Sequence, residues 1–166
     1  MYPILESAFS CFPMRKRVAE TFLRYGLSVS KEGGIYCGKI EMSPAKIARA
    51  LEIDRRVVLE TARMISAIPE LQGIFGHLEP TAFIGKAARH LGFEVIVIEA
   101  EPHAVGIIGR ATKIISDAKI TIRQIVADDP DIYPNPKLTI VLEKRLPANA
   151  LSKLRGMREI NRLSIE

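Results

Sequence analysis

Cysteine is scarce in this chain, and long apolar runs are missing from it. The 166 residues include two cysteines, Cys11 and Cys37, which are too few for a disulfide framework and lie in no Cys/His cluster typical of zinc. The most apolar stretch, residues 93–98, is interrupted by Glu94 and is far shorter than the ~20 residues that a membrane-spanning helix needs. The first residues lack the basic segment of a secretory signal. We therefore expect a cytoplasmic protein with no membrane association.

Positive charge is concentrated in the first part of the chain. The formal net charge is +5, and residues 1–68 carry 11 basic and 7 acidic side chains, whereas residues 69–166 carry 13 and 12. A positive field of this kind can steer a polyanion such as DNA toward the N-terminal part. The same charge is also consistent with an ordinary solvated basic surface, so charge alone leaves both interpretations open.

The pattern from residue 14 onward predicts a helix followed by a small β-hairpin. Apolar residues recur at helical spacings in Met14, Val18, Phe22 and Tyr25. Gly26 follows and can end this helix. Between residues 27 and 42, short β-like pieces flank a Lys-Glu-Gly-Gly segment, which supplies the positive φ that a hairpin reversal needs.

Two short helices are predicted within residues 43–67. Ser43 and Pro44 suit the N-cap and the first position of one helix, and Asp54 caps the other. This pair resembles the helix-turn-helix of DNA-binding regulators. The resemblance implies that the outward face of the second helix meets DNA through Arg55, Arg56, Leu59 and Arg63.

Residues 69–92 are predicted to connect two domains. The segment contains several glycines and prolines, but its apolar spacing also predicts a helix over residues 81–91, which Gly92 can terminate. The sequence leaves open whether this connector transmits a signal or only separates its neighbours.

Residues 93–166 predict the element order β-α-β-β-α-β. Strand-length apolar runs begin near residues 93, 120, 137 and 160, and helical spacing dominates residues 108–118 and 146–157. The order is typical of the ferredoxin-like arrangement, in which two helices cover one face of an antiparallel sheet. The predicted fold class is therefore α+β, with a helical N-terminal domain and a ferredoxin-like C-terminal domain.

The loop after the first of these strands carries a more specific pattern. It resembles the loop of the ACT domain, an amino-acid-sensing module, which usually reads Asp/Asn-x-Pro-Gly-hydrophobic. Gly106 matches the glycine, Ile107 follows as the hydrophobic residue and His103 stands near the polar position, whereas Val105 replaces the proline. The resemblance implies that two sheets join side by side in a homodimer, and it implies these ligand-binding candidates: Glu101, His103, Ala104, Val105, Gly106, Ile107 and Thr121.

The chemistry of such a loop suits an amino acid. Gly106 has no Cβ, so a bound group can approach the backbone closely, and the following helix directs N–H groups toward a carboxylate. Glu99, Glu101 or Thr121 could accept hydrogen bonds from the ammonium group. The alternative is a ferredoxin-like dimerisation domain with a tight loop and no ligand.

Over residues 15–166 the chain resembles a family of predicted prokaryotic regulators of amino-acid metabolism. This implies three parts: a helix-turn-helix-like domain (1–68), a connector (69–92) and an ACT-like domain (93–166) that binds a small ligand and acts allosterically on DNA binding. The alternative function is a metabolite-sensing interaction module that acts on a metabolic enzyme without DNA. We expect no catalytic site and no cofactor, because no Gly-x-Ser-x-Gly segment presents a nucleophile. We also expect no metal site, because the pattern of Asp128, Asp129 and Asp131 is typical of a solvated hairpin tip rather than of a cation site.

Overall fold

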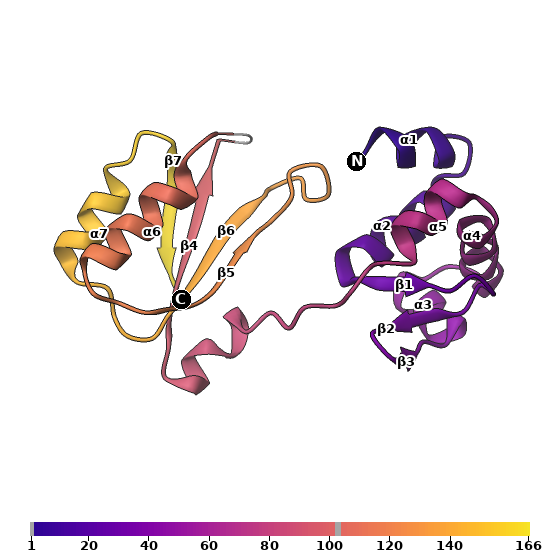
Figure 1. Cartoon of the computed structure of the whole chain (residues 1–166), viewed down its shortest axis with the longest axis horizontal. Helices are drawn as coiled ribbons and strands as arrows, with labels where there is room; N and C mark the ends of the chain where they lie inside the picture. The colour runs from indigo at the N-terminus through magenta and orange to yellow at the C-terminus, as the bar shows by residue number, and fades with distance from the viewer. Residues whose placement is uncertain (1, 102–103) are drawn as a thin grey trace. The chain divides into compact units, whose positions relative to one another are not determined.

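The computed structural model of the chain describes residues 2–101 and 104–166 and contains two compact units, Met1–Thr81 (unit 1) and Ala82–Glu166 (unit 2). Each unit combines helices with an antiparallel sheet (Figure 1), which confirms the predicted α+β class. No helix in the described ranges has both the length and the apolar character needed to cross a membrane.

Unit 1 is a helical unit with a small three-stranded sheet. Its elements are α1 (Pro3–Phe9), α2 (Pro13–Tyr25), β1 (Leu27–Val29), β2 (Ile35–Cys37), β3 (Ile40–Glu41), α3 (Pro44–Leu51), α4 (Arg55–Ala67) and α5 (Pro69–Phe75). The strands lie in the order β1-β2-β3, and each neighbouring pair is antiparallel. The hairpin predicted between residues 27 and 42 is therefore present, with a third short strand added to it.

The core of unit 1 includes two helices that the sequence analysis did not predict. In α1, Leu5 and Phe9 are fully buried one turn apart, and Leu71 and Phe75 are their counterparts in α5. The ring of Phe75 meets that of Phe22 from α2 edge-on, with the ring centroids 6.5 Å apart. Both helices begin at a proline and bury an i, i+4 apolar pair, so the signals for them were present but short.

Helices α3 and α4 match the predicted pair and are joined by a tight turn. The Asp54 side chain caps α4 by accepting a hydrogen bond from the backbone N–H of Arg56 at 2.7 Å. Glu52, in the turn, has φ +55°, a left-handed conformation that is uncommon for a residue other than glycine. The prediction for α2 is confirmed only in part. Val18 and Phe22 are buried as predicted, whereas Met14 and Tyr25, near the two ends of the helix, are exposed.

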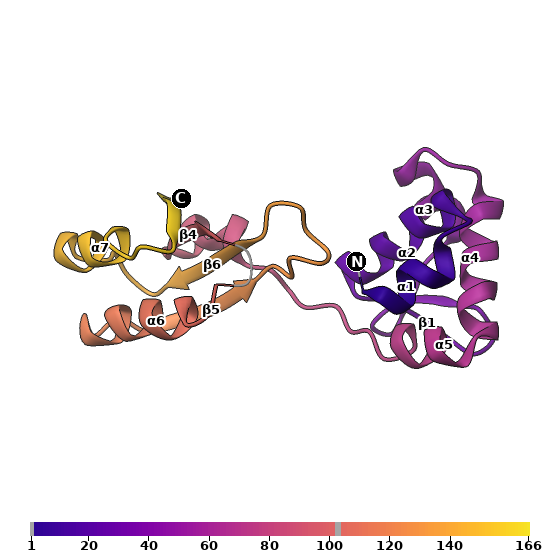
Figure 2. The same ribbon diagram turned by 90° about the horizontal axis from the view of Figure 1, so that it is seen from above.

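Unit 2 contains a four-stranded antiparallel sheet in the order β5-β6-β4-β7. Its elements are the 3₁₀ helix η1 (Gly85–Leu91), β4 (Glu94–Ala100), α6 (Ile107–Asp117), β5 (Ile122–Ala127), β6 (Lys137–Leu142), α7 (Ala148–Arg155) and β7 (Ile160–Ile165). Helices α6 and α7 lie along one face of the sheet (Figure 2) and bury Ile96, Ile98 and Ile140 against them.

The residues predicted as a connector are divided between the two units. Helix α5 belongs to the core of unit 1. The helix predicted over residues 81–91 begins only at Gly85 and is a 3₁₀ helix, and its Ala88 packs with Val95, Val97 and Val141 on the sheet face opposite α6 and α7. The side chain of Gln124 fastens the preceding segment, accepting from the backbone N–H of residue 84 at 3.0 Å and donating to the carbonyl of residue 82 at 2.7 Å.

Candidate functional site

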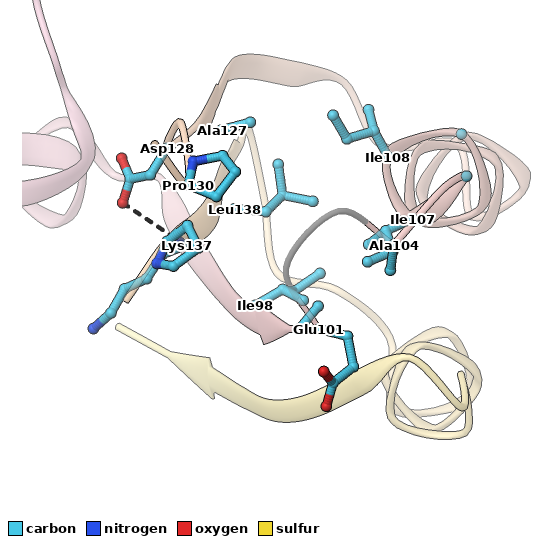
Figure 3. Close-up of a pocket in the computed structure, with 14 residues that line it drawn as sticks. Ile98, Glu101, Ala104, Ile107, Ile108, Ala127, Asp128, Pro130, Lys137 and Leu138 are labelled. Carbon is cyan, nitrogen blue, oxygen red and sulfur yellow. Dashed lines mark hydrogen bonds between the residues drawn. The ribbon is translucent and has the colours of Figure 1, made fainter. Parts of the chain in front are cut away.

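A cavity of about 230 Å³ opens in unit 2 where β4 ends and α6 begins (Figure 3). Its walls come from the end of β4 and the following loop, from the first turn of α6, and from the tip that joins β5 to β6. The sheet register brings these parts together, because Ile98 of β4 pairs with Leu138 of β6, and Leu138 also pairs with Ala127 of β5. Three segments that are distant in the sequence thus form one pocket.

Four of the seven predicted ligand residues line this cavity. They are Glu101, Ala104, Gly106 and Ile107. Val105 does not line it and is 91% exposed. The prediction for the loop therefore agrees with the location of the cavity, apart from Val105, whose side chain extends into solvent.

Thr121 does not lie at the cavity. Thr121 precedes β5 at the end of the sheet away from the loop, where its carbonyl oxygen accepts a hydrogen bond from the backbone N–H of Glu143 at 3.0 Å. The structure of a single chain does not bring Thr121 to the predicted loop. His103 lies outside the described residues.

Gly106 gives the loop its geometry. It is the N-cap of α6 with φ +86°, no described side chain caps the helix there, and the carbonyl of Gly106 accepts a hydrogen bond from the N–H of Arg110 at 3.0 Å. Among the residues that the structure describes, none has an atom within 4 Å of the position that a Cβ on Gly106 would take. The first turn of α6 is thus open at the cavity, and backbone N–H groups of a helix start favour an anionic group.

The sequence analysis missed the apolar side of the pocket. Ile98, Ile108, Ala127, Pro130, Pro136 and Leu138 line the cavity as well. Both Ile98 and Leu138 were predicted to lie in strands, and for Leu138 the alternation from residue 137 onward also predicted the face that it shares with Ile140 and Leu142. Their meeting at this cavity depends on the strand register, for which the sequence carried no separate signal.

The carboxylates that line the cavity already accept hydrogen bonds from other parts of the chain. Glu101 Oε1 accepts a hydrogen bond from Asn161 Nδ2 at 3.4 Å, and Asp128 Oδ2 accepts one from the backbone N–H of Lys137 at 3.1 Å. The Lys137 ammonium lies 3.4 Å from Glu99 Oε1.

An ion pair joins α6 to the start of β7. Arg110 Nη2 lies 2.8 Å from Glu159 Oε1, and the carbonyl of Glu159 accepts a hydrogen bond from the N–H of Glu101 at 3.3 Å. The pKa of the Glu159 carboxyl is lowered from its ordinary 4.5, first by a hydrogen bond from its own backbone and then by the Arg110 guanidinium. These contacts hold the loop end and the helix start beside the same strand.

A second candidate site is the outward face of α4 in unit 1. Arg55, Arg56 and Arg63 are exposed there, as predicted. Leu59 was predicted to be exposed and is instead half-buried. Glu60 is also an exposed residue of α4, and its Oε2 lies 2.6 Å from Arg15 Nη2. Because Arg15 of α2 compensates the negative charge of Glu60, the three exposed arginines of α4 determine the charge of this face.

Within residues 2–101 and 104–166, no three His, Cys, Asp or Glu side chains come together in a way that could hold a metal ion. Comparison with known protein families and with curated proteins gives no match. Among solved structures, one titled "Crystal structure of PH0061" is 16% identical, with 75% of this chain and 78% of that chain covered and a TM-score of 0.25. A likeness this weak carries no functional argument.

Proposed function

We propose that the chain is a cytoplasmic regulator of amino-acid metabolism that binds a small ligand, an amino acid, through a dimeric ACT domain in unit 2 and binds DNA through unit 1. One observation carries the proposal: Glu101, Ala104, Gly106 and Ile107, which the sequence marks as an ACT-like loop, surround a single cavity at the start of α6. A mostly apolar cavity with a few polar groups is the usual form of a small-molecule site.

The finer fold assignment belongs to this proposal. An order of β-α-β-β-α-β, with the strands arranged β5-β6-β4-β7 and both helices on one face, supports a ferredoxin-like ACT domain. The sheet ends in β5 and β7, and an edge strand has backbone groups available for pairing with another chain. A homodimer joined through such edges is the assembly that the ACT resemblance implies.

Thermal unfolding against individual L-amino acids at millimolar concentration tests the ligand-binding part. A ligand that binds only the folded state adds about 2.7 kcal/mol to stability at 100 times its Kd. We expect one amino acid, or a few of similar structure, to raise the midpoint selectively. If none does, unit 2 is a dimerisation domain without an amino-acid ligand.

The double variant Arg55→Ala with Arg56→Ala tests the DNA-binding part. Both arginines are exposed on α4, and each phosphate contact that is lost reduces the slope of log K against log salt by roughly 0.9. We expect weaker DNA binding with a slope that is shallower by about one to two. Fluorescence anisotropy over a salt series measures both quantities.

The charge-matched control is Lys153→Ala with Arg155→Ala in α7, where both side chains are exposed. This control also removes two positive charges, but from unit 2, and it should leave DNA binding nearly unchanged. Equal effects of the two double variants would show that α4 has no special role and that net charge alone attracts DNA.

An apolar surface beside α4 favours a second candidate function, a metabolite-sensing module that binds a protein. Phe12 and Met14, at the start of α2, are 41% and 43% exposed. The guanidinium of Arg15, a residue of α2 that pairs with Glu60 of α4, lies over the Phe12 ring, 4.4 Å from its centroid. Exposed aromatic and methionine side chains are enriched at protein interfaces. Binding to a protein that persists at high salt, without retention on DNA, would support this candidate.

A further inference from the structure

The β1–β2 turn of unit 1 (residues 30–34) is held in one conformation by its own hydrogen bonds. The backbone N–H of Ser30 donates to the carbonyl of Gly34 at 2.8 Å, and the N–H of Gly33 donates to the Ser30 carbonyl at 3.0 Å. The Ser30 hydroxyl oxygen accepts a further hydrogen bond from the N–H of Gly34 at 3.2 Å. A turn fixed in this way can present a side chain to a partner without first having to become ordered.

The β1–β2 turn lies beside the C-terminal end of α4. A Cβ built on Gly33 would lie 3.8 Å from the hydroxyl oxygen of Ser66. At the base of the turn, Nε2 of Gln72 in α5 donates a hydrogen bond to the carbonyl of Val29 at 3.1 Å. Figure 2 shows β1 and α5 at the same end of α4. Contacts from two different elements therefore place the turn at this end of the helix.

This end of α4 carries one of the exposed arginines proposed to meet DNA. Arg63 is exposed and precedes Ser66 by three residues, so the two side chains are neighbours on the helix surface. The Ser66 hydroxyl also donates a hydrogen bond to the Arg63 carbonyl at 3.0 Å. The β1–β2 turn therefore borders the outward face of α4 on the side of Ser66. The opposite border belongs to α2, whose Arg15 contacts Glu60 and Met64.

The β1–β2 turn carries one basic and one acidic side chain, and both are exposed: Lys31 and Glu32. The Glu32 carboxylate is held back on the turn. A hydrogen bond from its own backbone, and then one from the Ser30 hydroxyl, lower the pKa of this carboxyl from its ordinary 4.5. The Glu32 oxygens thus have partners within the turn, and the Lys31 ammonium is the charged group that the turn offers to an anion.

We propose that the β1–β2 turn is a second contact to DNA, in which Lys31 binds a backbone phosphate beside the groove that receives α4. The inference rests on the proposed function, in which α4 meets DNA. A phosphate contact from the turn adds affinity and fixes how α4 lies on the duplex, but it reads no base sequence. The Lys-Glu-Gly-Gly segment, which the sequence marks as a hairpin reversal, then takes part in binding as well.

Fluorescence anisotropy of the full chain with a labelled DNA duplex of mixed sequence tests the inference, because binding to such a duplex depends on phosphate contacts. The variant Lys31→Ala removes one contact. We expect the slope of log K against log salt to become shallower by about 0.9, and the affinity at about 0.1 M salt to fall roughly five- to tenfold. Lys31→Arg keeps the positive charge and should bind like the wild type.

Lys39→Ala is the matched control. Lys39 is another exposed lysine in a hairpin turn of unit 1, the turn between β2 and β3, so each variant removes one positive charge. That turn lies at the other end of β2. A Cβ built on Gly38 there would be 3.8 Å from Pro80 and would have no described atom of α4 within 4 Å. We expect Lys39→Ala to leave the salt slope and the affinity nearly unchanged.

The outcomes separate this inference from the proposed function. If Lys31→Ala and Lys39→Ala have equal effects, or if neither has an effect, the β1–β2 turn makes no special contact and the inference is wrong. DNA binding through α4 still stands in that case if Arg55→Ala with Arg56→Ala weakens it. Binding by Lys31→Arg as weak as that of Lys31→Ala would also overturn the inference, because charge would not account for the loss. If the wild type does not bind DNA at any salt concentration, both the inference and the DNA-binding part of the proposed function are overturned.

Discussion

Gly106 and Gly26 both have positive φ, but the surroundings differ. At Gly106, φ is +86° and a Cβ would have no described atom within 4 Å. At Gly26, φ is +62° and a Cβ would lie 2.5 Å from the carbonyl oxygen of Glu79. The sequence predicts the first glycine from the ACT-like loop and the second from the end of a helix. The approach of Glu79 to Gly26 was not predictable, because no local pattern links two positions so far apart in the chain.

Gly106→Val is expected to abolish ligand binding and to leave the chain folded. A β-branched residue at positive φ is strained by roughly 1–3 kcal/mol, and its methyl groups would occupy the approach to the start of α6. Gly92→Val is the matched control, because Gly92 also has positive φ and open space around it but lies outside the cavity. Thermal shift with the ligand should be lost in the first variant only. A normal shift in Gly106→Val would remove this loop from the site.

Gly26→Ala is expected to lower the free energy of unfolding of unit 1. The loss should exceed the strain of placing an alanine at positive φ. The new Cβ would overlap the backbone at Glu79, and overpacking of this kind costs about 1–3 kcal/mol. Gly33→Ala is the control, since Gly33 has φ +82° but its nearest neighbour would be 3.8 Å away. Urea unfolding of the two variants measures the difference. If the two variants lose the same free energy of unfolding, the backbone near Glu79 shifts to accommodate the new Cβ without an energetic cost.

At the scale of elements, the start of α6 is anchored to β7 as well as to β4. The Arg110 to Glu159 ion pair makes this link, next to the hydrogen bond from Glu101 to the Glu159 carbonyl. Helical and strand spacing in the sequence predicted both elements, since each has a regular apolar pattern. The ion pair that connects them was not predictable, because charged residues on exposed positions have no pattern that identifies a distant partner.

Glu159→Gln is expected to reduce the stability of unit 2 at neutral pH but not in acid. The folded-state pKa of Glu159 is lowered, so the carboxylate stabilises the fold above its ordinary pKa of 4.5 and this contribution is lost as pH falls through the lowered value. Urea midpoints of the two proteins over a pH series should therefore converge in acid. Glu143→Gln, at an exposed position, is the control for loss of one negative charge. A difference from wild type that is constant down to the lowest pH would contradict this role for Glu159.

Elements without a long pattern were the ones that sequence analysis missed. Helices α1 and α5 have seven residues each, which is too short for a periodic signal beyond one i, i+4 pair. They persist because each buries a leucine and a phenylalanine in the common core. Isolated helices of this length are unstable in water, so packing rather than local preference accounts for them.

At the scale of the whole molecule, two units of different composition share one chain. Unit 1 contains the exposed arginines of α4, and unit 2 contains the cavity. Our proposed function requires that ligand binding in one unit alters DNA binding by the other. Such coupling is a free energy between two sites and must be the same in both directions.

We predict that the ligand changes DNA affinity by some factor, and that DNA changes ligand affinity by that same factor, typically about 5- to 150-fold for an allosteric protein. Anisotropy with labelled DNA at saturating ligand gives the first factor, and calorimetry with DNA-saturated protein gives the second. If both affinities are unaffected, the two binding activities are independent and the regulatory part of the proposal is wrong.

The amino-acid sequence by itself determined the α+β class, the order of the main elements and the position of the loop at Gly106, because these depend on local periodicity and on glycine and proline chemistry. Only the tertiary structure decided the pocket. Ile98, Leu138 and Ala127 meet at the loop because antiparallel pairing aligns the ends of β4, β5 and β6. The same pairing leaves Thr121 at the opposite end of the sheet. Strand register is set by packing across the whole sheet, and no single segment of the sequence contains that information.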